Sequence, residues 1–197
     1  LVTALYSPTT AALVPALVAR AEQDDFQGWF ALALAAGHDD GISTGMQLAV
    51  ICSEDVSRLT AAEVSAAREV SLFRDYLLRG PIAACAHWPR ASMPESYYAP
   101  VASAVPVLLL SGDLDPVTPP VWAASVAPHL TRSRLVTLPA TGHGVAATPC
   151  GARLVHQFLA DGDADALDTK CSAAPRRPPF VVTPAGPDPL APDGGRP

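Results

Sequence analysis

The sequence has few charged residues, few aromatic residues and almost no lysine. Charged residues make up 16% of its 197 residues and aromatic residues 6%, and Lys170 is its only lysine. The net charge is −6 and no basic cluster occurs, so we expect no nucleic-acid partner. No apolar run reaches the roughly 20 residues that cross a bilayer, so we expect no membrane span.

Leader and metal-binding patterns are also missing. The chain begins at Leu1 and shows no signal-peptide pattern, so we expect a piece of a longer or processed protein. Its cysteines form no C-x-x-C pair and no histidine lies at zinc-finger spacing, which predicts neither a metal site nor a cofactor. The segment His38-Asp39-Asp40 carries ligand-type side chains, but three adjacent residues cannot all face one ion. We expect a solvated turn there.

The apolar content of the chain is sufficient for a folded core. Hydrophobic residues make up 49% of the sequence and the mean hydropathy is +0.23, which argues against disorder throughout. Four widely spaced cysteines predict two disulfides and an oxidising compartment. The alternative is four buried thiols in a cytosolic protein. The cysteines are Cys52, Cys85, Cys150 and Cys171.

The first hundred residues have a mostly helical pattern. Apolar residues recur with helical spacing over residues 11–21 and 26–36. Thr60 and Glu63 form a capping box, which predicts a helix over residues 61–78. This part of the chain is therefore expected to be built from helices.

Three other segments lack a continuous helical pattern. Met46–Cys52 is a short apolar run that fits a strand as well as a helix, and we interpret it as a buried strand. Gly80-Pro81 predicts the end of the preceding helix. After Cys171 the chain is rich in proline, glycine and arginine without periodicity, so residues 172–197 are predicted to be disordered.

Two predicted strands each end in residues that carry chemistry. The apolar run Val107–Leu110 predicts a strand buried on both faces, as in a parallel sheet, and Asp113 and Asp115 follow it. Ser133–Leu138 predicts a second strand, which leads to His143 between two glycines. Ligands and catalytic groups of open α/β sheets lie at this carboxyl end of the strands.

An acid after one strand and a histidine after the next match the second half of a Ser-Asp-His triad. Asp115 and His143 are about 28 residues apart, which leaves room for one helical crossover. We choose Asp115 as the orienting acid because Pro116 stiffens its turn, and we assign Asp113 to turn hydrogen bonding. Asp115 is predicted to lie about 2.6–3.2 Å from Nδ1 of His143. Thr118 is expected to cap the helix that follows. The alternative makes both triad candidates ordinary turn residues.

Two alternative sites and one non-catalytic function remain open. Ser43 lies in a G-x-S-x-G pattern, but a nucleophile elbow needs a strand before the serine, and a helical segment and an acidic loop precede it. A flexible loop is the competing interpretation of Ser43. Asp113 and Asp115 also fit the nucleophile motif of haloacid-dehalogenase-like, Mg²⁺-dependent phosphotransferases, which need a downstream lysine. The third possibility is a catalytically incomplete module that binds a partner.

Four motifs together resemble one family, and the resemblance covers roughly residues 1–171. The chain resembles the C-terminal portion of the TAP-like (tripeptidyl aminopeptidase-like) serine hydrolases, in the α/β-hydrolase superfamily. The motifs are Gly45–Asp55, Cys85–Pro89, Gly112–Pro119, and Gly142–Gly144 followed by Cys150.

The resemblance implies the C-terminal part of an α/β-hydrolase fold, a parallel sheet with flanking helices, plus a helical lid. Residues 1–100 would form the lid and return segment, and residues 101–171 would carry the triad acid and base. The resemblance also implies secreted, periplasmic or cell-envelope enzymes that act on peptides with free amino termini or on esters. The family's nucleophile elbow and oxyanion hole lie upstream of the lid. The implied partner is therefore the missing N-terminal half, and the chain alone is expected to be nearly inactive.

Two residues outside the triad are candidates for substrate contact. The Glu54 carboxylate could pair with a peptide amine, the alternative being a surface ion pair. Trp88 could line a substrate cleft, the alternative being packing beneath the lid. The predicted disulfides, one of three connectivities that four cysteines allow, are Cys52–Cys85 and Cys150–Cys171.

Overall fold

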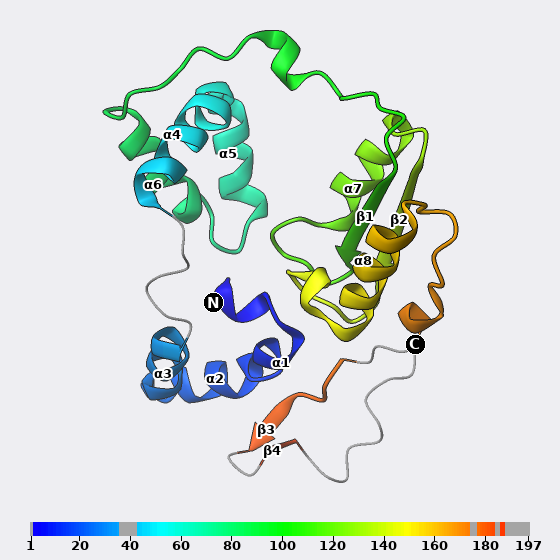
Figure 1. The fold of residues 1–197 in the computed structure, drawn as a ribbon. Coiled ribbons are helices and arrows are strands. Elements are labelled where there is room, and N and C mark those ends of the chain that lie inside the picture. Colours follow the sequence, from blue (N-terminus) through cyan, green and yellow to red (C-terminus); the bar gives the residue numbers. More distant parts are fainter. Residues whose placement is uncertain (1, 36–42, 174–176, 184–185, 188–197) are drawn as a thin grey trace. The chain divides into compact units, whose positions relative to one another are not determined.

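The computed structural model describes residues 2–35, 43–173, 177–183 and 186–187 (Figure 1). Its internal contacts divide the chain into two units: a first unit of residues 1–36 and 100–197, and a second unit of residues 37–99. The segment expected to form a lid, residues 1–100, is thus divided, because its first 36 residues group with the strands.

A parallel pair of strands with helices around it forms the centre of the first unit. β1 and β2 pair in parallel, in a register that places Gly112 opposite Leu138. Both predicted strands are confirmed, and Figure 1 shows α7 and α8 beside them. The elements of this part are β1 (Val107–Gly112), α7 (Pro120–Val126), η4 (Ala127–His129), β2 (Ser133–Leu138), η5 (Val145–Ala147), α8 (Pro149–Asp161) and η6 (Lys170–Ala173).

The core of the first unit lies between the strands and α8. Leu108 and Leu110 of β1 alternate toward it because successive strand residues point to opposite faces. β1 is half-buried except at Ser111 and Gly112, so the prediction of a strand buried on both faces is wrong. Within the described residues the sheet has two strands, and each keeps one unpaired edge. The buried core residues are Val136, Leu138, Val145, Leu154 and Leu167.

Short helices and two short strands of the C-terminal segment complete the first unit. The helices predicted over 11–21 and 26–36 are present as α2 and α3, and the Asp25 side chain accepts a hydrogen bond from the Gln27 N–H at the start of α3. The Val181 N–H of β3 donates to the Ala12 carbonyl. Part of residues 172–197 lies outside the described residues, so their disorder stays a prediction. These elements are η1 (Thr3–Leu5), α1 (Pro8–Ala11), α2 (Val14–Ala21), α3 (Gln27–Ala35), β3 (Val181–Thr183) and β4 (Gly186–Pro187).

The regular elements in the described part of the second unit are all helices. The strand expected over Met46–Cys52 is wrong, because these residues lie in α4. The half-buried Gly45 and Leu48 and the buried Cys52 are three and four residues apart and so share one helix face. The elements are α4 (Thr44–Glu54), η2 (Val56–Arg58), α5 (Ala61–Val70), α6 (Tyr76–Cys85) and η3 (Glu95–Tyr98).

The single helix predicted over residues 61–78 is two helices. Its start is confirmed, because Thr60 and Glu63 form the expected capping box. α5 ends at Val70, and Arg74 has a positive φ of 51° in the connection to α6. Gly80-Pro81 lies inside α6 instead of ending a helix. Contacts of α6 with α4, and a disulfide between the two helices, offset the weak helix propensity of Gly80 and Pro81.

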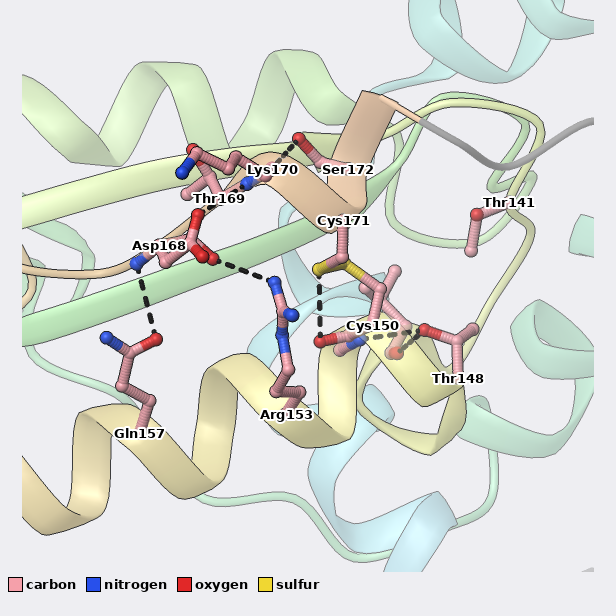
Figure 2. The surroundings of a disulfide bond; sticks show 12 residues. Thr141, Thr148, Cys150, Arg153, Gln157, Asp168, Thr169, Lys170, Cys171 and Ser172 are labelled. Carbon is pink, nitrogen blue, oxygen red and sulfur yellow. Dashed lines mark hydrogen bonds between the residues drawn. A yellow bond between two sulfur atoms is a disulfide. The ribbon is translucent and has the colours of Figure 1, made fainter.

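Both predicted disulfides are confirmed, and all four cysteines are paired. Cys52–Cys85 joins α4 to α6, with Cα atoms 5.2 Å apart. Cys150–Cys171 joins α8 to η6, with Cα atoms 5.6 Å apart. Figure 2 shows how polar contacts reinforce this second link: Arg153 donates to the Asp168 carbonyl at 3.1 Å, and the Asp168 N–H donates to Gln157 at 3.2 Å.

Among the described helices, none has the length and apolar character that a membrane crossing requires.

Candidate catalytic site

The loops that follow β1 and β2 are joined by backbone hydrogen bonds. The Asp113 N–H donates to the Leu138 carbonyl at 3.1 Å, and the Leu114 N–H donates to the Thr141 carbonyl at 3.0 Å. In return, the Thr141 N–H donates to the Asp113 side chain at 3.2 Å. Asp113 therefore ties one loop to the other, in keeping with its assignment to turn hydrogen bonding.

Two glycines allow the backbones around these loops to approach closely. A Cβ atom on Gly112 would collide with the carbonyl oxygens of Thr141 and Gly142. A Cβ atom on Gly142 would collide with the Tyr6 carbonyl. Any larger residue at either position would push these loops apart, so the glycines help to set the position of His143.

Asp115 and His143 meet at the carboxyl edge of the two strands. Nδ1 of His143 lies 3.0 Å from Oδ2 of Asp115 and 3.2 Å from Oδ1, which confirms the predicted contact. Asp115 is 7% exposed, whereas the His143 side chain is 39% exposed. Nε2 of His143 has no hydrogen-bond partner among the described residues. The pair therefore presents one free imidazole nitrogen, backed by a buried carboxylate.

The surroundings of Asp115 keep its carboxylate ionised. Burial raises its pKa, but hydrogen bonds from the Thr118 N–H and hydroxyl, from His143 and from the Val117 N–H lower that pKa to about 2. The Val117 and Thr118 N–H groups donate to Oδ1 at 2.8 and 2.9 Å. An ionised carboxylate can only accept hydrogen bonds, so Nδ1 of His143 carries a proton and Nε2 of the neutral ring is the basic nitrogen.

Thr118 has a role that the sequence did not reveal. Its hydroxyl donates to Oδ2 of Asp115 at 2.7 Å and lies 3.4 Å from Nδ1 of His143. The prediction that Thr118 caps the next helix is wrong, because Pro119 occupies the N-cap position of α7. Aspartate followed three residues later by threonine is a local side-chain–backbone turn, and this spacing was the available signal.

Tyr6 is a second neighbour of His143 that the sequence did not indicate. The His143 N–H donates to the Tyr6 carbonyl at 2.8 Å. The Tyr6 and His143 rings lie with their centroids 5.3 Å apart and their planes at 57°. No local pattern could have suggested this contact, because it joins residues that are far apart in the sequence.

The other candidate residues belong to the second unit and have contacts there. Ser43 is exposed and precedes α4 directly, without a side-chain cap hydrogen bond. Glu54 accepts a hydrogen bond from the Tyr97 hydroxyl at 2.7 Å, and the Trp88 ring lies over Gly45. The first two residues of the G-x-S-x-G pattern and the segment His38-Asp39-Asp40 lie outside the described residues.

The carboxylates of the phosphotransferase alternative are engaged in the two joined loops. Asp115 accepts from backbone and side-chain groups of its own turn and from His143, and Asp113 accepts from Thr141. The part of the chain that the structure describes contains no group of three His, Cys, Asp or Glu side chains placed to hold a metal ion.

Comparison with known families gives a match over the same region. The family model described as "TAP-like protein" matches residues 69–171, more than half of the 197-residue chain. The chain belongs to the TAP-like family. The match includes both Asp115 and His143 and extends to Cys171, so the predicted resemblance and the α/β-hydrolase C-terminal fold class are confirmed. No curated protein and no solved structure shows significant similarity to this TAP-like chain.

Proposed function

We propose that this TAP-like chain supplies the acid and the base of a serine hydrolase. The observation that supports the proposal is the Asp115–His143 pair, in which a buried, ionised carboxylate accepts from Nδ1 and leaves Nε2 free. This arrangement is the one that a Ser-Asp-His triad needs, because Nε2 must face the nucleophile while the acid holds the ring.

His143 would act twice in the reaction. Its Nε2 takes the proton of a serine hydroxyl as that oxygen attacks the substrate carbonyl, and the imidazolium then protonates the leaving amine or alkoxide. Asp115 stays ionised throughout, and its negative charge stabilises the imidazolium. Thr118 and Val117 keep the carboxylate in place through their hydrogen bonds. The serine and the oxyanion hole come from an upstream portion of the enzyme.

The substrate class proposed is a peptide with a free amino terminus, or an ester. Residues 1–100 are the proposed lid and return segment, and Glu54 in this segment is the candidate for binding a substrate amine. One of its oxygens accepts from Tyr97, and the other has no partner among the described residues. Trp88 is the candidate for an apolar wall. Two disulfides are typical of oxidising compartments, which supports a secreted or cell-envelope location.

The test is labelling with a fluorophosphonate probe, which reacts with activated serines. The chain alone should remain unlabelled and should not cleave aminoacyl or short acyl-ester substrates. The chain joined to an upstream segment that carries a strand–G-x-S-x-G–helix unit should be labelled and active. His143→Ala should abolish labelling, whereas His129→Ala, which changes an exposed histidine of η4, should not.

One outcome would overturn the upstream position of the nucleophile, and a second would overturn the hydrolase proposal itself. Robust labelling of Ser43 in the chain alone would identify residues 41–45 as a working elbow and end the view of a missing nucleophile. Failure of the complete enzyme to label, with both disulfides formed and the fold intact, would favour the non-catalytic binding module.

A further inference from the structure

The second unit contains a polar cavity of about 400 Å³. It lies between the end of α4, η2 and the segment that leads from residue 90 into η3. Two arginines and three serines line it, together with Glu95, Ala91, Met93 and Tyr98. The arginines are Arg58 and Arg90, and the serines are Ser53, Ser57 and Ser92.

Arg58 is held at the cavity mainly by an aromatic ring. Its guanidinium carbon lies 3.8 Å from the centroid of the Tyr98 ring, within the range of a cation–π contact. Its ion pair with Glu95 is long, at 3.4 Å, and the Glu95 side chain is 88% exposed. Exposed pairs of this kind contribute little to stability, so Arg58 can exchange its ion pair with Glu95 for one with a ligand anion.

Arg90 and Ser53 have donor groups that no described residue uses. Arg90 is exposed and forms no ion pair or hydrogen bond within the described residues. Ser53 is 8% exposed, and its hydroxyl oxygen accepts from the Ala91 N–H at 3.0 Å. The hydroxyl hydrogen of Ser53 has no acceptor among the described residues. A cavity with two cationic groups and a buried donor is suited to a ligand with acceptor atoms.

The floor of the cavity is covalently anchored. Ser53 directly follows Cys52, which is bonded to Cys85 of α6. The Ser57 hydroxyl also donates to the Ser53 carbonyl at 2.8 Å, which ties η2 to the end of α4. These links hold Ser53 and Ser57 in place before any ligand arrives, so little ordering is needed on binding.

We propose that this cavity binds a small ligand through an oxyanion group, a phosphate or a carboxylate. Guanidinium groups match the geometry of both oxyanions with paired N–H donors, and Ser53 adds a hydroxyl at the floor. Glu95 is the one carboxylate among the residues that line the cavity, and its side chain is 88% exposed, so solvent screens its charge. The proposal does not depend on the hydrolase function.

The test is a titration of the full chain with both disulfides intact. Binding is monitored by calorimetry and by NMR of the arginine side chains. One titration uses inorganic phosphate and the other uses acetate. The anion that binds more tightly identifies whether the cavity prefers a phosphate or a carboxylate. We expect saturable binding of one anion per chain. Arg90→Gln should weaken it about tenfold or more, since a hydrogen bond to a charged group typically accounts for such a change.

Matched variants separate a specific site from general attraction. Arg132→Gln removes an exposed arginine of the first unit and should leave binding unchanged. Arg90→Lys keeps the charge but loses the planar fork, and should give intermediate affinity. The Arg90 side chain has no ion pair or hydrogen bond among the described residues to lose, so these variants should fold normally. Absence of saturable binding, or equal weakening by Arg90→Gln and Arg132→Gln, would overturn the proposal.

Discussion

The two disulfides lie in very different surroundings. Cys150–Cys171 packs against a cluster of buried apolar side chains that includes Leu138 and Leu154. Cys52–Cys85 has no such cluster beside it: among the described residues of the second unit, the only buried ones are the two cysteines and Ser53. In the first unit the disulfide is added to a hydrophobic core. In the second unit the disulfide supplies most of the buried residues.

This difference assigns the two links different physical roles. Apolar burial stabilises the folded state directly, in proportion to the area removed from water. A disulfide acts mainly by restricting the unfolded chain, and its effect increases slowly with the length of the closed loop. The second unit should therefore depend on oxidation, and the first unit on packing.

The largest expected effect is loss of the second unit when its disulfide is removed. The double substitution Cys52→Ala with Cys85→Ala opens a link of sequence separation 33. The chain-entropy relation gives about 3–4 kcal/mol for such a loop, and no buried apolar cluster remains to offset the loss. Hydrogen exchange should show residues 43–99 unprotected while β1, β2 and α8 keep their protection.

The matched control is Cys150→Ala with Cys171→Ala. It opens a link of similar separation, 21 residues, but leaves the apolar core in place. The first unit should then be less stable yet still folded. Native protection of residues 43–99 after loss of Cys52–Cys85 would disprove the contrast between the units.

A core substitution tests the other side of the comparison. Leu154 is fully buried in α8, so Leu154→Ala should destabilise the first unit by about 2–5 kcal/mol through lost burial and a cavity. Urea denaturation measures the change. Leu159→Ala, at an exposed position of the same helix, should change stability by about 0.5 kcal/mol or less. Equal effects of the two substitutions would mean that the α8 face does not form the core.

The candidate catalytic pair adds a smaller, pH-dependent term to the first unit. The pKa of Asp115 is lowered from 3.8 to about 2 in the folded protein. A depressed acid pKa contributes stability above the unfolded value, and this contribution disappears as pH falls from about 4 to about 2. The expected loss is about 1–2 kcal/mol. Denaturation at a series of pH values should show it, and Asp115→Asn should flatten the profile in this range.

Asp161→Asn supplies the comparison for that measurement, because Asp161 is an exposed residue at the end of α8. Its acid profile should follow that of the unsubstituted protein. A profile for Asp115→Asn that is as steep as the original would show that Asp115 does not contribute.

The smallest expected effect is local to the second unit. Thr60→Ala removes the cap of α5, with a typical cost of about 1 kcal/mol. The first-turn amides of α5 should exchange faster with solvent, whereas Thr60→Ser should retain most of their protection. Unchanged exchange in the alanine variant would mean that the capping box does not stabilise this helix.

The strands and the Asp115–His143 pair were predictable because their signals are local. Val107–Leu110 and Ser133–Leu138 are short apolar runs, each followed by a turn that carries a polar residue. Parallel pairing places both carboxyl ends at one edge, so Asp115 and His143 follow their strands on the same side of the sheet. Their role in catalysis remains a proposal.

The helices of the second unit were harder to predict. Met46–Cys52 has seven residues, all apolar except Gln47, a length at which periodicity does not separate a strand from a helix. Gly80-Pro81 resembles a helix end but lies within α6. In both places tertiary contacts, including the link between α4 and α6, outweigh a weak local preference.

The sequence by itself determined which residues can carry chemistry: an acid and a histidine after successive strands, and cysteines that pair in the predicted way. Only the tertiary structure decided what surrounds them. The Thr118 hydroxyl turns to Asp115, and the Tyr6 carbonyl receives the His143 N–H. Strand and turn patterns arise from neighbouring residues and can be read along the chain. Contacts between distant segments depend on how the whole chain packs, and no short stretch of sequence specifies them.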